Sequence, residues 1–204
     1  MSSDLVNLTA QLGVEKTCLL GHAEGGRVSM LTALTRPNLV DRLVVVSSSP
    51  MNTTTSLARW DRYREACYIV DTILRSHGMQ LEEARVELTL EVDNALKGTL
   101  KNRSERALFL SNLGKINTEA FLTNPDMGRF PTLDGNTYNG PTMFITGEKK
   151  PSWECDTDVR TIRQLFPNSF FVKVWIFSLF ETSGGVAVSV PLGSQGCARP
   201  AFAC

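Results

Sequence analysis

Histidine is scarce in this 204-residue chain, which contains only His22 and His77. The two histidines are far apart and have no cluster of Cys, Asp or Glu between them, so we expect no metal site. The five cysteines are scattered, odd in number and without a Cys-x-x-Cys pair. This usage is typical of reduced thiols in an intracellular protein and excludes a disulfide framework or a zinc finger. We therefore expect neither a metal nor another cofactor.

Excess charge and long apolar runs are also missing. Lys+Arg and Asp+Glu both total 21, so the net charge indicates no nucleic-acid partner and no anionic membrane surface. No apolar run reaches the roughly 18 residues needed for a membrane span. The first residues, Met1-Ser2-Ser3-Asp4, lack the basic start and apolar core of a signal peptide. The length and the 42% hydrophobic content suit one globular domain with its own core.

The most informative stretch is a glycine-rich turn. An apolar run at 17–20 ends in Gly21-His22-Ala23-Glu24-Gly25-Gly26, and a helical pattern follows over 27–34. A strand that turns sharply into a helix needs glycine where side chains would collide, and it leaves the first helical N–H groups unpaired. This is the layout of the nucleophile elbow Gly-x-Ser-x-Gly, with Ala23 at the serine position. A phosphate-binding turn is a weaker interpretation, because neither Gly-x-Gly-x-x-Gly nor a following Lys-Ser/Thr is present.

Alternating helix and strand patterns predict an α/β fold. Leu5, Leu8 and Leu12 predict an amphipathic helix, with Ser3 as its cap and Gly13 at its end. The helix after the turn is expected to bury Val28, Leu31 and Leu34. Strands are predicted at 17–20, 43–46, 142–146 and 170–174, and a helix at 158–166. The continuous run at 43–46 is typical of a parallel strand covered on both faces.

The segment 56–128 has a different pattern, because apolar residues recur there at helical spacing. We interpret it as an inserted helical cap. Apolar stripes of this kind usually form a core, and a lid over an apolar ligand pocket is the alternative interpretation.

Several short runs occur in a characteristic order along 3–174: Asp4-Leu5, Leu12-Gly13, Gly21-His22-x-x-Gly25-Gly26, Arg36-Pro37-x-Leu39-Val40-x-Arg42-Leu43, Asn112-Leu113, Lys115-Ile116-Asn117-x-x-Ala120, Gly140-Pro141-Thr142, Gly147 and Leu165-Phe166-Pro167. In their order and spacing these runs resemble the α/β-hydrolase superfamily. Within it they resemble the subfamily called α/β-hydrolase domain-containing protein eleven and its bacterial esterase relatives. The resemblance implies the C-terminal part of a mostly parallel sheet flanked by helices, with the cap at 56–128. It also implies ester and acylglycerol hydrolysis, a small acyl-ester or lipid-like ligand, and a mitochondrial location, or otherwise a cytoplasmic one.

The catalytic residues that the resemblance implies are incomplete here. A triad needs a nucleophile, a histidine base and an acid that orients the histidine. Ala23 takes the nucleophile position, and no histidine follows His77, so the catalytic histidine expected after the strand at 170–174 is missing. The subfamily's acid position corresponds to Glu119. Asp156 and Asp158 are alternatives that we rank lower, and Glu119 could equally be a solvated helix residue.

We expect neither of the chain's two histidines to act as the base, and we expect an incomplete oxyanion hole. His22 is expected to pack and hydrogen-bond beside the elbow, and His77 to lie in a surface turn. The backbone N–H of Glu24, with that of Gly25, would donate to an oxyanion. The resemblance implies that the second donor comes from the family's first strands, and we expect this chain to lack them. Loss of a triad nucleophile costs on the order of 10⁶ in turnover, and loss of an oxyanion donor about 10²–10³. We therefore expect an inactive member of a hydrolase lineage.

The tail 175–204 departs from the family pattern. From residue 176 onward it carries only two charged residues, Glu181 and Arg199, and has no helical stripe. We interpret it as an alternative or mis-spliced C-terminus that replaces the usual histidine loop and last helix, and we expect it to lower solubility. A non-catalytic module that binds an acyl ligand or a partner is the competing hypothesis for the whole chain.

Overall fold

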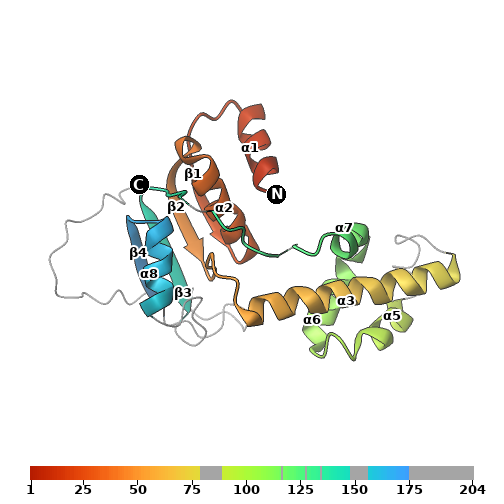
Figure 1. Ribbon diagram of the computed structural model, residues 1–204. Helices are drawn as coiled ribbons and strands as arrows, with labels where there is room; N and C mark the ends of the chain where they lie inside the picture. The colour runs from red at the N-terminus through yellow and green to blue at the C-terminus, as the bar shows by residue number, and fades with distance from the viewer. Residues whose placement is uncertain (79–88, 116, 127, 134, 148–155, 175–204) are drawn as a thin grey trace. The chain divides into compact units, whose positions relative to one another are not determined.

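The computed structural model describes residues 1–78, 89–115, 117–126, 128–133, 135–147 and 156–174 (Figure 1). The elements are α1 (Ser2–Gln11), β1 (Thr17–His22), α2 (Glu24–Thr35), η1 (Pro37–Leu39), β2 (Val40–Val46), α3 (Thr54–His77), α5 (Thr89–Leu96), α6 (Arg103–Ser111), η2 (Leu113–Lys115), α7 (Thr118–Thr123), β3 (Thr142–Gly147), α8 (Asp156–Leu165) and β4 (Ser169–Val174). None of the described helices is long and apolar enough to cross a bilayer.

The four strands form one parallel sheet in the order β1-β2-β3-β4. All four lie at the positions that the sequence predicts, each extended by one or more residues. The chain connects neighbouring strands through helices, which are the usual crossover between successive parallel strands. The α/β class with a mostly parallel sheet is therefore confirmed.

The chain divides into two compact units. One comprises Met1–Met51 together with the chain from Phe130 onward, and the other is Asn52–Arg129. The first unit contains the sheet with α1, α2 and α8, and the second contains only helices among its described residues. The second unit includes the segment in which the sequence predicts an inserted helical cap.

In the first unit, α2 and α8 cover the same face of the sheet (Figure 1). Their core residues, among them Met30, Ala33 and Ile162, pack against side chains of β2 and β3 such as Val45 and Phe144. The predicted stripe on α2 is therefore partly wrong: of its three members only Leu34 is buried, because the sheet lies a little further round the helix. No helix among the described residues packs on the opposite face, so the expected cover on both faces of β2 is not seen there.

The first helix begins differently from the prediction. α1 starts at Ser2, its N-cap is Met1, and no side chain caps it, so the proposed cap at Ser3 is wrong. Instead, the hydroxyl groups of Ser2 and Thr32 lie 2.8 Å apart, which ties α1 to α2. Gly13, with φ +67°, follows the end of the helix as expected.

The helical unit has its own hydrophobic core. Thr53 caps α3 by accepting a hydrogen bond from the Ser56 N–H, and Gly78 ends it in the left-handed conformation. The apolar stripes predicted for this segment meet in the core, whose fully buried members include Val70, Val92 and Leu96. Of the predicted stripe positions, Leu74 and Val92 are buried in this core, and Tyr63 and Ile69 pack against it partly buried. Tyr68, 63% exposed, is a wrong member of the stripe, and the predicted positions from 79 to 88 lie outside the described residues.

Candidate functional site

The turn between β1 and α2 has the geometry of a nucleophile elbow. β1 ends at His22, α2 begins at Glu24, and Ala23 between them has φ 52° and ψ −118°. This conformation is rare for a residue with a Cβ and costs of order 1–3 kcal/mol. The N–H of Ala23 donates to the carbonyl of Val46, 3.0 Å away, which holds the turn against the end of β2. The chain thus keeps the strained backbone of an elbow although the residue there has no hydroxyl.

Two glycines allow the strand and the helix to touch through their backbones. A Cβ on Gly21 would lie 2.4 Å from the carbonyl oxygen of Gly25 and 2.7 Å from the Cα of Gly26. A Cβ on Gly26 would lie 2.8 Å from the Cβ of Ser48. Contacts this short do not occur with real Cβ atoms, so glycine is required at both positions. Gly25 is different, because nothing lies within 4 Å of the place where its Cβ would be.

The N-terminus of α2 presents unpaired donors at this turn. The N–H groups of Gly26 and Arg27 both point to the carbonyl of Ala23, at 3.1 and 3.4 Å. The N–H groups of Glu24 and Gly25 precede them and have no acceptor within the helix, as at any helix start. They are the donors that the sequence analysis assigned to an oxyanion, and the helix dipole adds partial positive charge there.

Glu24 and Arg27 form an ion pair beside these donors. Arg27 Nε lies 4.0 Å from a carboxylate oxygen of Glu24. Burial raises the pKa of the Glu24 carboxyl, and the charge of Arg27 partly offsets the rise. Burial likewise lowers the pKa of the Arg27 guanidinium, with Glu24 acting in the opposite direction. A carboxylate at this place opposes the binding of an anion by the adjacent N–H groups.

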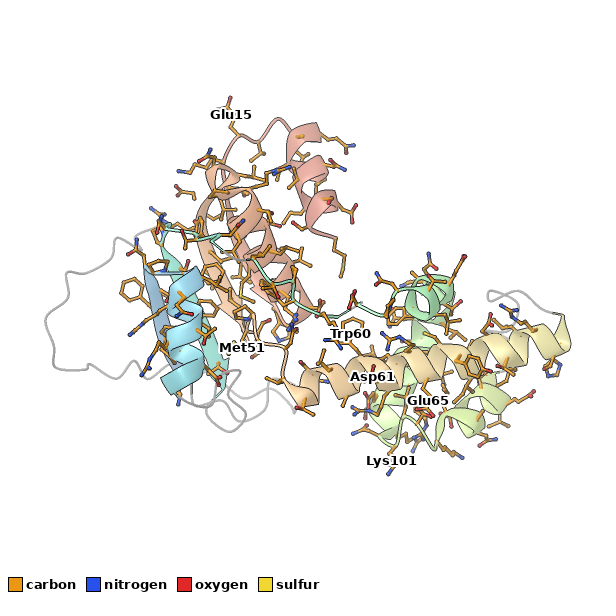
Figure 2. The ribbon with its side chains drawn as sticks, viewed as in Figure 1. Glu15, Met51, Trp60, Asp61, Glu65 and Lys101 are labelled. Carbon is orange, nitrogen blue, oxygen red and sulfur yellow. The ribbon has the colours of Figure 1, made fainter. Side chains whose placement is uncertain are left out.

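Arg27 also ties the elbow to the loop after β2. Its Nη1 donates to the carbonyl of Met51 at 3.0 Å and to that of Ser49 at 3.4 Å, and its guanidinium lies 5.5 Å from the centre of the Phe130 ring. Met51 is labelled in Figure 2 at the end of this loop. Sequence reasoning missed Arg27, because its acceptors are backbone carbonyls more than 20 positions away. Nothing in a single sequence marks such acceptors.

The candidate acids belong to different parts of the chain. Glu119 is exposed in the first turn of α7 and belongs to the helical unit, so its role as a triad acid stays a prediction. Asp158 is partly exposed near the start of α8. The side chain of Asp156 lies outside the described residues.

Each of the two histidines is exposed on its own unit. His22 ends β1 and is exposed, so the structure gives it no packing role. His77 lies at the end of α3, where its Nε2 is 3.3 Å from a carboxylate oxygen of Glu91. Both of these side chains are substantially exposed, at 41% and 50%, as expected for a histidine in a surface turn.

The described residues contain no group of three His, Cys, Asp or Glu side chains that could hold a metal ion. A surface crevice of about 400 Å³ lies between α1 and the end of α2, with Val6, Thr9, Arg36 and Leu39 in its walls. It does not include the elbow, so we assign it no part in the chemistry of the turn.

Comparisons show that the chain is similar to proteins named as hydrolases. No protein-family model matches it. It is 36% identical over 178 residues to the sn-1-specific diacylglycerol lipase ABHD11 of Danio rerio, covering 82% of this chain and 52% of the relative. For the Mus musculus protein of the same name, the identity is 31% over 183 residues, with 83% and 55% covered. The chain thus spans about half the length of these curated relatives.

A solved structure, described as a marine microorganism esterase, matches the fold. Its TM-score is 0.60 at 20% sequence identity, and the match covers 85% of this chain and 67% of that one. An identity this low speaks for the fold alone. Together with the parallel sheet and the elbow, it agrees with the architecture that the sequence predicts.

Proposed function

The chain is an ABHD11-like protein of the α/β-hydrolase superfamily, and we propose that it keeps the elbow of an ester hydrolase but performs no serine-triad hydrolysis. The observation that carries the proposal is Ala23 in the strained elbow conformation, at the position where the superfamily places its nucleophile. A methyl group can neither attack an acyl carbon nor be activated by a base. Relatives named as diacylglycerol lipases support the lineage.

The histidine base and the oxyanion site also support the proposed absence of hydrolysis. The chain has no histidine after His77, and His77 is paired with Glu91 in the helical unit. Loss of the nucleophile alone reduces turnover by on the order of 10⁶, and a missing base adds little because triad members act as a unit. The Glu24 carboxylate also opposes an oxyanion at the first N–H groups of α2.

A second candidate is a module that binds an acyl ligand without turnover. It is favoured by the retained elbow, in which the N–H groups of Glu24 and Gly25 remain free of helical acceptors and could donate to an ester carbonyl. A neutral carbonyl is compatible with the neighbouring Glu24, whereas a free carboxylate is repelled by it. The ligand class would be an uncharged acyl ester.

Activity is tested on the purified full chain with a fluorophosphonate probe and a short-chain p-nitrophenyl ester, beside an active serine esterase as positive control. We expect no labelled serine and no turnover above the uncatalysed rate. We also expect Ala23→Ser to restore no ester hydrolysis, because no base is available. Labelling of a serine near the elbow, such as Ser48, or turnover by Ala23→Ser would overturn the proposal.

Ligand binding is tested separately, by titrating the chain with a long-chain methyl ketone, which keeps the carbonyl but cannot be hydrolysed, and following heat release. Ala23→Asp places a carboxylate that competes with the ketone for the N–H groups of Glu24 and Gly25, and should weaken binding at least tenfold. Asn7→Asp, which adds the same charge on exposed α1, should leave it unchanged. Equal affinities in both variants would exclude the elbow as the binding site without restoring catalytic activity to the chain.

A further inference from the structure

The sequence contains a single Asn-Gly pair, Asn139-Gly140, in the loop that leads into β3. Asn139 is exposed, and neither residue belongs to a helix or a strand. In an asparagine followed by glycine, the side-chain amide is open to attack by the next backbone nitrogen. Glycine permits this attack because it has no Cβ to block the approach and a wide choice of backbone angles. Asn139 is therefore the asparagine of this chain whose sequence context most favours self-modification.

The two reacting groups are unengaged within the described part of the chain. No hydrogen bond there involves the side-chain amide of Asn139 or the backbone N–H of Gly140. Two other asparagines of the sheet unit are held by their side chains. The Nδ2 group of Asn136 donates to the carbonyl of Leu34 at 3.1 Å, and that of Asn168 donates to the carbonyl of Asn139 at 2.7 Å. Reaction at either of them first requires the loss of a hydrogen bond.

The hydrogen bond from Asn168 also acts on the reacting peptide unit. Its acceptor is the carbonyl oxygen of Asn139, which belongs to the same peptide unit as the nitrogen of Gly140. When that nitrogen loses its proton, the negative charge is shared with the carbonyl oxygen through the resonance of the peptide bond. A donor at the oxygen stabilises this charge, as hydrogen bonds to ionised groups do. The fold thus favours the form of the nitrogen that attacks.

Packing requires the glycine of this pair. A Cβ on Gly140 would overlap the hydroxyl oxygen and the ring of Tyr138. Tyr138 is buried, and its hydroxyl group donates to the carbonyl of Val40 at 3.1 Å, which holds the ring in place. The contact that makes glycine necessary at position 140 therefore also keeps a glycine next to Asn139.

We propose that Asn139 deamidates in the folded chain to aspartate and isoaspartate through a cyclic imide. The deprotonated nitrogen of Gly140 attacks the side-chain carbonyl carbon of Asn139 and forms a new C–N bond. The side-chain nitrogen then leaves as ammonia, taking up the proton that the Gly140 nitrogen released. Water adds to one of the two ring carbonyls and breaks its bond to the Gly140 nitrogen. Opening at the former side-chain carbonyl gives aspartate, and opening at the main-chain carbonyl gives isoaspartate.

Isoaspartate at position 139 disturbs the start of β3, because its backbone runs through the former side chain. The chain there becomes longer by one carbon–carbon bond of about 1.5 Å. The anchors on either side are the N–H of Tyr138, which donates to the carbonyl of Leu165 at 2.9 Å, and the N–H of Thr142, which donates to that of Asn168 at 3.2 Å. The longer chain cannot keep both anchors unchanged, so the modified protein is expected to be less stable. The inference does not depend on the proposed absence of turnover, which concerns the elbow.

The test incubates the purified full chain at 37 °C and pH 8 in water labelled with ¹⁸O, followed by trypsin digestion in ordinary water. Only conversion during the incubation then carries the heavy oxygen. Trypsin cleaves after Arg129 and Lys149, so Asn136 lies on the same peptide as Asn139 and is the internal control. Fragment masses locate the labelled residue, and an isoaspartyl methyltransferase with a radioactive methyl donor counts isoaspartate. Asn139→Gln is the matched variant, because its longer side chain forms the corresponding larger ring slowly.

We expect label at position 139 to be at least tenfold more abundant than at positions 136 and 168. Asn168→Asp removes the donor from the carbonyl of Asn139 and should slow the labelling severalfold. After incubation, the unmodified fraction of the chain should keep its Tm, the fraction with isoaspartate should melt several degrees lower, and Asn139→Gln should show no change.

Equal labelling of the three asparagines would overturn the proposal. So would an Asn139 that stays unlabelled in the folded chain and becomes labelled only in urea, because the fold would then protect the pair. Faster labelling in Asn168→Asp would overturn the assigned effect of the Asn168 hydrogen bond. Since the readout is a mass and a melting temperature, it is independent of any ester turnover.

Discussion

Replacement of Gly21 by alanine tests the packing of the elbow directly. The new Cβ would lie 2.4 Å from the carbonyl oxygen of Gly25, 2.6 Å from its carbonyl carbon and 2.7 Å from the Cα of Gly26. All three atoms belong to the backbone of α2, so no side chain can rotate away. The contact is relieved only when the start of α2 moves off β1.

The cost follows from this rigidity. Forcing extra carbon into a packed site costs typically 1–3 kcal/mol, and because only backbone can yield we expect the upper end, about 3 kcal/mol in the free energy of unfolding. For a chain of this size, 1 kcal/mol corresponds to about 2–4 °C in Tm. Gly21→Ala should therefore lower the Tm by roughly 6–12 °C.

The matched control is Gly25→Ala, four residues away in the same turn. Gly25 is exposed in the first turn of α2, and its Cβ would meet nothing within 4 Å. Alanine is preferred over glycine in a helix by about 1 kcal/mol in the interior, and by less near its start. We expect Gly25→Ala to leave stability unchanged or raise it by up to about 1 kcal/mol.

Urea unfolding of both variants, followed by circular dichroism at 222 nm, gives the two free energies under identical conditions. The prediction is a difference of about 3–4 kcal/mol between them. If the two variants unfold within about 0.5 kcal/mol of each other, within the range of ordinary surface substitutions, α2 does not contact β1 at Gly21 and the elbow geometry is wrong.

Three further predictions concern other positions. Ala23→Gly should raise stability by about 1 kcal/mol, because relief of about 1–3 kcal/mol of strain exceeds the entropy cost of glycine; urea unfolding checks it. Burial raises the pKa of the Cys67 thiol from 9.0 to about 11. The unfolded chain therefore loses this proton first, and the Cys67 thiol should lower stability by about 2 kcal/mol between pH 9 and 11. Cys67→Ala should remove this part of the fall and leave the part that comes from Tyr63 and Tyr138, whose pKa values burial also raises. Arg106 donates to Asp93 and to two backbone carbonyls, so Arg106→Met should lower the free energy of unfolding by about 3 kcal/mol, as measured by thermal unfolding. Arg103→Met, at an exposed position, is the control and should lower it by less than about 0.5 kcal/mol.

Much of the fold is predictable from local sequence. The apolar runs that become β1 to β4 have the length and composition of parallel strands, and all four form. Gly78 ends α3 in the left-handed conformation, as its place after a helical stripe indicates. Ser3 is a wrong prediction as a cap, because it could cap the helix only if α1 started two residues later, at Asp4, and α1 starts at Ser2. Helix starts depend on competing hydrogen bonds, here that of Ser2 with Thr32.

The site was predictable only in part, for a similar reason. The glycines around Ala23 identify the elbow because the geometry of a turn depends mainly on residues that are adjacent in the sequence. The links of Arg27 to Ser49, Met51 and Phe130 join parts of the chain that are distant in sequence. Such contacts depend on how β1, α2 and the loop after β2 meet in space.

By itself, the sequence determined the class of the fold, the hydrolase lineage, the alanine at position 23 of the turn and the absence of a histidine between His77 and residue 204. Each of these features is either a local sequence pattern or the presence or absence of a residue type at a given place in the chain. Only the tertiary structure showed that Ala23 is held in a strained conformation and that Gly21 and Gly26 sit in backbone contact. It also showed that Leu20, Val44, Met143 and Phe170 share one face of the sheet. Strand register and helix placement decide which residues share a face, and both arise from packing between segments that are far apart in the chain.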